Sequence, residues 1–92
     1  MIVRIIGEGQ FDVPDAHLDE LNRLDEDLLK AADGGAQEAF TAALEALLAS
    51  VRTAGDELPA DHLGPSDLVL PSPDATIEEV RDLLGDEGLI PG

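Results

Sequence analysis

The first apolar pattern lies at the N-terminus, where residues 2–6 are aliphatic except for Arg4. Because β-branched side chains favour extended backbone and Glu8-Gly9 can form a tight turn, residues 1–14 are predicted to form a β-hairpin that ends at Pro14. The apolar side chains of the first strand fall on both of its faces, whereas a half-exposed strand alternates apolar and polar positions. We therefore expect other elements to cover both faces.

Leucine and alanine recur at three- and four-residue spacing through residues 15–54, which is the pattern of amphipathic helices. Asp15 is expected to cap the first helix, and Gly34-Gly35 is expected to end it. Gly55 is expected to end the second helix as a left-handed cap. Because their connection is short, the two helices are predicted to pack as an antiparallel hairpin.

The remaining segment, residues 55–92, carries five of the six prolines and ten acidic residues against one basic residue, Arg81. Two short elements can still be predicted in it. Residues 67–70 (Asp-Leu-Val-Leu) have the composition of a short strand between prolines. Residues 76–79 (Thr-Ile-Glu-Glu) form a capping box that opens a third helix.

These elements predict an α+β fold in one domain spanning residues 1–92. It comprises an N-terminal β-hairpin (1–14), an antiparallel two-helix hairpin (15–54) and a Pro-rich segment (55–92) with a short third strand and a C-terminal helix. A chain of 92 residues has room for one core. With only 2% aromatic residues, that core must be aliphatic.

Charge narrows the choice of partners. Twenty-one acidic residues against five basic ones give a formal net charge of −16, which opposes contact with phosphate backbones and anionic lipid. We therefore expect no nucleic-acid binding and no direct membrane contact. The N-terminus lacks a signal-peptide core, and no apolar run approaches the roughly 20 residues of a membrane span, so a cytoplasmic location is predicted.

Patterns that carry chemistry are sparse. The chain has no cysteine, and its two histidines, His17 and His62, lie far apart, so both are interpreted as surface residues. The Gly7-Glu8-Gly9 turn lacks the third glycine of a dinucleotide site. The consecutive acids 25–27 should fan around a helix as a solvated face. We therefore predict a protein that is not an enzyme, without catalytic, metal or cofactor residues.

Several blocks of the chain resemble the PspA-associated protein family, PspAA, of actinobacteria and archaea. They are the opening Met-Ile-Val-Arg-Ile-Ile-Gly-Glu-Gly-Gln-Phe (1–11), Gly-Pro-Ser-Asp-Leu-Val-Leu-Pro (64–71), Thr-Ile-Glu-Glu-Val (76–80) and Glu-Gly-Leu-Ile-Pro-Gly (87–92). Phe11 stands where an aromatic residue, often tyrosine, is expected in that family. The resemblance implies a small partner of phage-shock protein A (PspA), the coiled-coil, ESCRT-III-like membrane-stress protein.

A non-catalytic interaction module that binds PspA and modulates its assembly in the envelope stress response is thus the first hypothesis. Candidate partner-binding residues are the terminal Leu89 and Ile90, together with Phe11, Ile2 and Arg4 of the hairpin. A small ligand- or metal-binding domain that uses carboxylates of the 55–92 segment, around Asp67 and Asp74, is an alternative. Self-assembly into a homo-oligomer through the apolar first strand is another.

Overall fold

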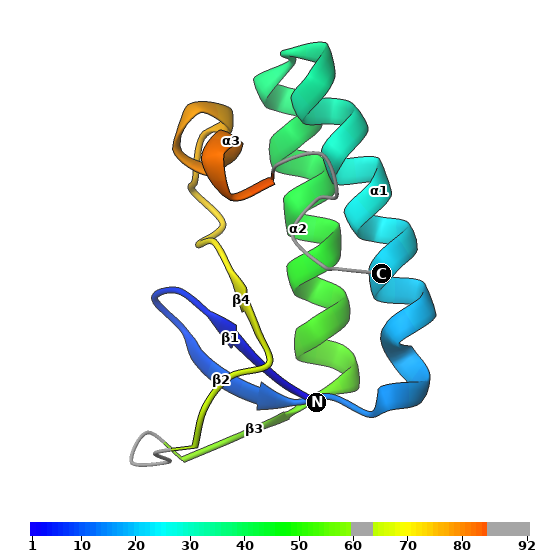
Figure 1. Cartoon of the computed structure of the whole chain (residues 1–92), viewed down its shortest axis with the longest axis vertical. Helices are drawn as coiled ribbons and strands as arrows, with labels where there is room; N and C mark the ends of the chain where they lie inside the picture. Colours follow the sequence, from blue (N-terminus) through cyan, green and yellow to red (C-terminus); the bar gives the residue numbers. More distant parts are fainter. Residues whose placement is uncertain (60–63, 85–92) are drawn as a thin grey trace.

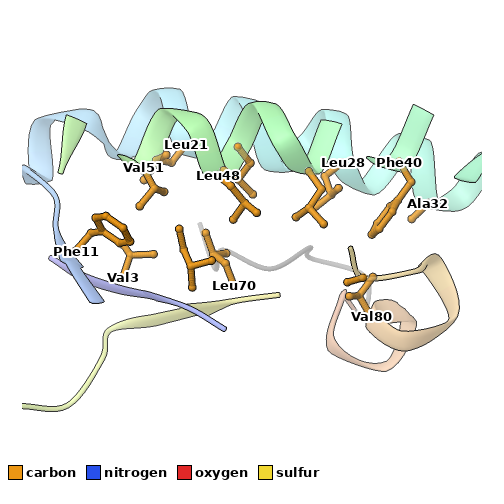
Figure 2. Close-up of a cluster of buried hydrophobic side chains, with 14 of the residues drawn as sticks. Val3, Phe11, Leu21, Leu28, Ala32, Phe40, Leu48, Val51, Leu70 and Val80 are labelled. Carbon is orange, nitrogen blue, oxygen red and sulfur yellow. The ribbon is translucent and has the colours of Figure 1, made fainter. Parts of the chain in front are cut away.

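The computed structural model describes residues 1–59 and 64–84, and it has the α+β architecture predicted from the sequence. Helices α1 (Leu18–Gly34) and α2 (Gln37–Ala54) run side by side in one layer, with a four-stranded sheet and the short helix α3 (Ile77–Leu84) in the other (Figures 1 and 2). The side chains between the layers form one aliphatic core that contains both phenylalanines.

Four short strands form the sheet, in the order β3-β2-β1-β4. Strand β1 (Ile2–Ile5) pairs antiparallel with β2 (Gly9–Asp12) on one side and parallel with β4 (Leu68–Leu70) on the other. Between β2 and β3 the chain forms both long helices, and its last strand, β4, then pairs beside the first. Strand β3 (Asp56–Glu57), which pairs antiparallel with β2, was not predicted.

Only one face of β1 is fully buried, so the expectation that both faces are covered is wrong. Val3 and Ile5 are fully buried beneath the helices, whereas Arg4 between them is exposed. Ile2 is half-buried, and Ile6 lies beyond the strand and is 50% exposed. The strand thus alternates in the ordinary way, and the face that carries Arg4 is left partly open to solvent.

The hairpin turn is also longer than expected. Ile5 pairs with Gly9, so the connection is the three residues 6–8 rather than a Glu8-Gly9 turn. The N–H of Glu8 donates to the carbonyl of Ile5 at 3.0 Å, and Gly7 and Gly9 have φ angles of 88° and 125°. Those angles strain residues with a Cβ atom, which explains why both positions are glycine.

Residue Gly55 ends α2, but not as the left-handed cap that we predicted. Its backbone is extended, with φ −97° and ψ 157°. The glycine is required here by space, because a Cβ atom at this position would lie 2.8 Å from the Val51 carbonyl oxygen and 2.9 Å from Cγ2 of Val13. The other predicted helix end, at Gly35, is confirmed: its φ is 73° and its N–H donates to the Ala32 carbonyl at 3.1 Å.

Residue Asp15 does not cap α1, contrary to the prediction. It begins a single 3₁₀ turn, η1 (Asp15–His17), whose N-terminus has no side-chain cap. Its carboxylate lies 3.2 Å from the Met1 ammonium group, which also donates to the Val13 carbonyl at 3.0 Å. The positive charge of the chain terminus therefore holds a carboxylate that would otherwise be available to the helix.

Two predictions in the C-terminal segment are confirmed. Strand β4 lies within the predicted residues 67–70, and α3 begins at the predicted capping box. In that box the N–H of Glu79 donates to Oγ1 of Thr76 at 3.2 Å. Helix α3 is also tied to the hairpin of helices, because the N–H of Ile77 donates to Oε1 of Gln37 at 3.0 Å.

The Met1 amine gives a pH prediction. Its hydrogen bond with Asp15 raises the pKa of the amine above the usual value, and the negative charges of Asp15 and Asp12 act in the same direction against desolvation. A group with a raised folded-state pKa stabilises the fold fully below its unfolded pKa of about 8, and this contribution disappears as the pH rises through the folded value. The melting temperature should therefore decrease as the pH rises above about 8.

This decrease is easy to isolate, because the chain contains no tyrosine and no cysteine and has a single lysine, Lys30. Thermal melts of the wild type and of Asp15→Asn between pH 7 and 10 measure it. The variant should lose less stability over this range than the wild type. Parallel curves for the two proteins would contradict the assigned role of the Met1–Asp15 pair.

Candidate interaction surfaces

The outer face of the sheet, opposite the helices, is the first candidate surface. Side chains alternate along β1, so Arg4 points outward, and its register partner on β4, Val69, points the same way. Ile6 follows one step beyond Ile5 and extends the ladder, because its N–H donates to the Leu70 carbonyl at 3.0 Å. Ile6 and Val69 are 50% and 51% exposed, the most exposed large hydrophobic residues in the described part of the chain.

One half of this outer face is covered by the chain itself. Gln10 of β2, the register partner of Arg4, is only 6% exposed. Its amide nitrogen donates to Oγ of Ser66 at 2.8 Å and to the Gly64 carbonyl at 3.2 Å, so the segment that leads into β4 lies over this part of the sheet. Nε of Arg4 reaches Ser66 Oγ at 3.4 Å. Within the part of the chain that the structure describes, this cover reaches as far as Arg4, which is exposed.

The hairpin turn is held in place from the helical layer. Nε of Arg52, on α2, donates to Oε1 of Glu8 at 2.7 Å, and its Nη2 donates to the second carboxylate oxygen. This ion pair is bidentate. The hydrogen bonds from Arg52 lower the pKa of Glu8, and burial opposes this with a smaller effect. The ion pair between Arg52 and Glu8 anchors the hairpin turn to α2 and thereby fixes the position of Ile6 in that turn.

The groove between α1 and α2 is the second candidate surface. It forms a hollow of about 390 Å³ lined by small residues of α2, such as Ala46 and Ala49, and by Leu24 of α1. At one end, Nε2 of His17 lies 2.7 Å from Ser50 Oγ and 3.0 Å from Glu20 Oε2. His17 is half-buried, and these two contacts connect α1 with α2.

These three residue types occur in hydrolytic triads, but their geometry here differs. In a triad the serine and the carboxylate bind opposite nitrogens of the imidazole, so that the carboxylate orients a base that serves the serine. Here both contacts are made by the same nitrogen, Nε2. The arrangement is that of a polar link between the helix ends.

One acidic residue departs from its prediction. Asp25 was assigned to a solvated face together with residues 26 and 27, yet it is 3% exposed, on the buried side of α1, and it has a polar interaction partner. The helical phase explains the difference, because residue 25 follows Leu21 by four positions and precedes Leu28 by three. Glu26 and Asp27 are exposed, as predicted.

The two carboxylates proposed for a ligand site have separate partners. Oδ2 of Asp67 accepts the N–H of Ile2 at 2.8 Å, which begins the pairing of β4 with β1. Oδ1 of Asp74 accepts the hydroxyl of Ser72 at 2.6 Å within a turn. Over the described residues, no group of three histidine, aspartate or glutamate side chains is placed to hold a metal ion.

The five candidate partner-binding residues fall into three groups. Arg4 and Ile2 share the outer face of the sheet, the first exposed and the second half-buried. Phe11 is 7% exposed and belongs to the core, because it pairs with Val3 and shares its inward orientation, so it offers no accessible surface. Leu89 and Ile90 lie outside the described residues. Val69 was not predicted as a candidate contact residue, although it lies in the predicted strand of residues 67–70.

The described part of the chain is a small α+β domain whose open sheet face and helical groove are its two candidate interaction surfaces. A family model described as PspA-Associated protein matches residues 1–92, the whole chain, and the chain belongs to that family. The comparison with curated proteins gives no match, and neither does the comparison with solved structures. None of the described helices combines the length and the apolar character that crossing a membrane requires.

Proposed function

We propose that this chain is a non-catalytic, cytoplasmic interaction module that binds a PspA coiled-coil protein and modulates its assembly in the envelope stress response. The observation that carries the proposal is the family match over all 92 residues, in a family described by its association with PspA.

The charge of the chain supports an indirect relation to the membrane. A formal net charge of −16 repels the anionic headgroups of a cytoplasmic leaflet. A protein of this charge that acts in membrane stress should therefore reach the bilayer through its partner. The exposed carboxylates of α1 and α2 would in turn attract a basic partner over distances of about 10 Å at moderate salt.

The experiment that tests the proposal combines the purified chain with the purified PspA protein of the same organism. We expect a complex at micromolar concentrations in size-exclusion chromatography and calorimetry. We also expect a change in the size distribution of PspA assemblies by light scattering when the chain is added. If both proteins are folded and no complex forms, the proposal is wrong. Binding with no effect on PspA assemblies would leave an adaptor without the modulating role.

Salt dependence provides a further prediction. Because the 21 acidic residues repel one another in the compact state, added sodium chloride should raise the melting temperature of the free chain. The affinity for PspA should decrease over the same range, since screening weakens attraction between an acidic protein and a basic partner. Calorimetry between about 50 and 500 mM salt measures this slope. An affinity that is constant or rises with salt would assign the contact to apolar side chains instead.

A further inference from the structure

The open half of the outer sheet face brings together two features that are rare on this chain. Its apolar part consists of Ile6 and Val69, the two large hydrophobic residues with the greatest described exposure. Its charged part is Arg4, one of only five basic residues in the sequence. Val69 stands directly opposite Arg4 in the ladder, and Ile6 lies two positions along from it on the same side. We call these three side chains the Arg4 patch.

Among the described residues, Arg4 has no carboxylate partner, whereas Arg23 and Arg52 each have one. Arg52 is paired with Glu8, and Arg23 lies 3.6 Å from Glu20. Arg4 forms no ion pair within residues 1–59 and 64–80, although this part of the chain is rich in carboxylates; its hydrogen bond is to the neutral hydroxyl of Ser66 at 3.4 Å. A guanidinium group with donors that the described residues leave unused, beside two aliphatic side chains, can bind a carboxylate of a partner.

We propose that the Arg4 patch is the surface that contacts PspA, and that it takes an acidic side chain of the partner that is flanked by apolar side chains. The inference rests on the proposed function and locates its contact. Ile6 and Val69 would exclude water around the ion pair, which strengthens the attraction between a guanidinium and a carboxylate. Arginine surrounded by apolar contacts is a frequent centre of binding energy in protein interfaces.

Charge argues against a second copy of this chain as the occupant. A symmetric pairing through the patch would bring two Arg4 side chains toward each other, because a two-fold interface places the same patch on both subunits. It would also bring two chains of formal charge −16 together. A different chain that presents a carboxylate at the patch and is basic elsewhere meets neither obstacle.

The test compares two charge reversals. Arg4→Glu and Lys30→Glu change the net charge by the same amount, but Lys30 is an exposed residue of α1, in the other layer of the fold. We expect Arg4→Glu to weaken binding of the full chain to PspA by at least about tenfold, because it sets two carboxylates against each other. Lys30→Glu should stay within about twofold of the wild type. Equal affinities for the two variants would overturn the proposal.

A second pair of variants tests the apolar part of the patch without changing charge. Val69→Ser should weaken binding about threefold to tenfold, and Ala49→Ser, in the groove between the helices, should leave it unchanged. Circular dichroism melts of each variant check that the fold persists. A photo-crosslinking residue at position 69 should crosslink to PspA, and one at position 49 should not. Crosslinks from position 49 alone would move the contact to the helical groove.

These outcomes separate the two proposals. If the wild-type chain does not bind PspA, the proposed function fails, and the assignment of the Arg4 patch as the contact with PspA fails with it. If the wild type binds and both patch variants bind equally well, the function stands and the Arg4 patch is excluded. Sedimentation of the free chain at increasing concentration gives a separate check, since a dimer that Arg4→Glu dissociates would assign the patch to self-association.

Discussion

Replacing Phe40 by alanine is expected to lower the free energy of unfolding by about 3–5 kcal/mol, the range found when buried aromatic side chains are truncated. Phe40 is fully buried on α2 and points toward Val80 of α3, beside Ala32 of α1 (Figure 2). The ring thus fills the place where three helices meet away from the sheet. In a domain of this size, whose total stability is about 5–15 kcal/mol, such a loss removes a large fraction of the stability.

Chemical denaturation followed by circular dichroism measures the effect, with Val69→Ala as the control. Val69 is 51% exposed, so its truncation should change the free energy of unfolding by less than about 1 kcal/mol. Phe40→Leu should fall between the two, because leucine fills part of the space. If Phe40→Ala costs no more than Val69→Ala, the packing of α3 on the helical hairpin is not a significant source of stability.

Replacing Gly55 by alanine is expected to cost about 1–3 kcal/mol, although the change adds one methyl group. That methyl would lie 2.8 Å from the Val51 carbonyl, 2.9 Å from Val13 Cγ2 and 3.1 Å from Phe11 Cβ. The first contact is with backbone, which cannot move without disturbing the last turn of α2. Either the helix end or the strand residues must shift, and both belong to the junction between the two layers.

Gly34→Ala provides a matched control with the opposite sign. Gly34 is the last residue of α1, and apart from its chain neighbours and the backbone of its own helix no atom lies within 4 Å of the position where its Cβ would be. Alanine should therefore stabilise the protein by up to about 1 kcal/mol, because it restricts the unfolded chain and favours helix. Melting temperatures that shift in opposite directions for the two variants would establish that space, not backbone conformation, requires glycine at position 55.

Most helices and strands could be read from the sequence, because the signals for them are local. The leucine and alanine spacing through residues 15–54 encodes two amphipathic helices wherever they pack, and the capping box at Thr76 encodes the start of α3. The same is true of the short strand within residues 67–70, which prolines delimit. These elements depend on neighbours within about four residues, so a single sequence contains the information that specifies them.

The predictions for Asp15 and Gly55 were wrong because a residue from a distant segment contacts each of them. Asp15 has the chemistry of a helix cap, but the Met1 ammonium group, 14 positions earlier in the chain, holds its carboxylate. Gly55 has the pattern of a left-handed helix end, but the approach of Val13 and Phe11 requires its missing side chain for another reason. In both cases the deciding partner belongs to an element distant in sequence.

The same limit applies to the candidate contact surface. Arg4 and Ile2 could be singled out from the sequence, since they lie in a strand with apolar residues on both sides. Phe11 could not be separated from them, because the pattern does not say which face of the hairpin the helices cover. Once Val3 and Ile5 pack inward, Phe11 follows them through the strand register and Arg4 is left outside.

The sequence by itself therefore determined the class of fold, the order of its main elements, the strong negative charge and the family to which the chain belongs. Tertiary structure alone decided that β4 pairs in parallel with β1 and that Val69 thereby stands beside Arg4. The physical reason is that hydrophobic periodicity specifies which side chains of an element share a face. Which element covers that face, and which face stays open, depends on contacts between residues more than 60 positions apart, such as Ile2 with Asp67.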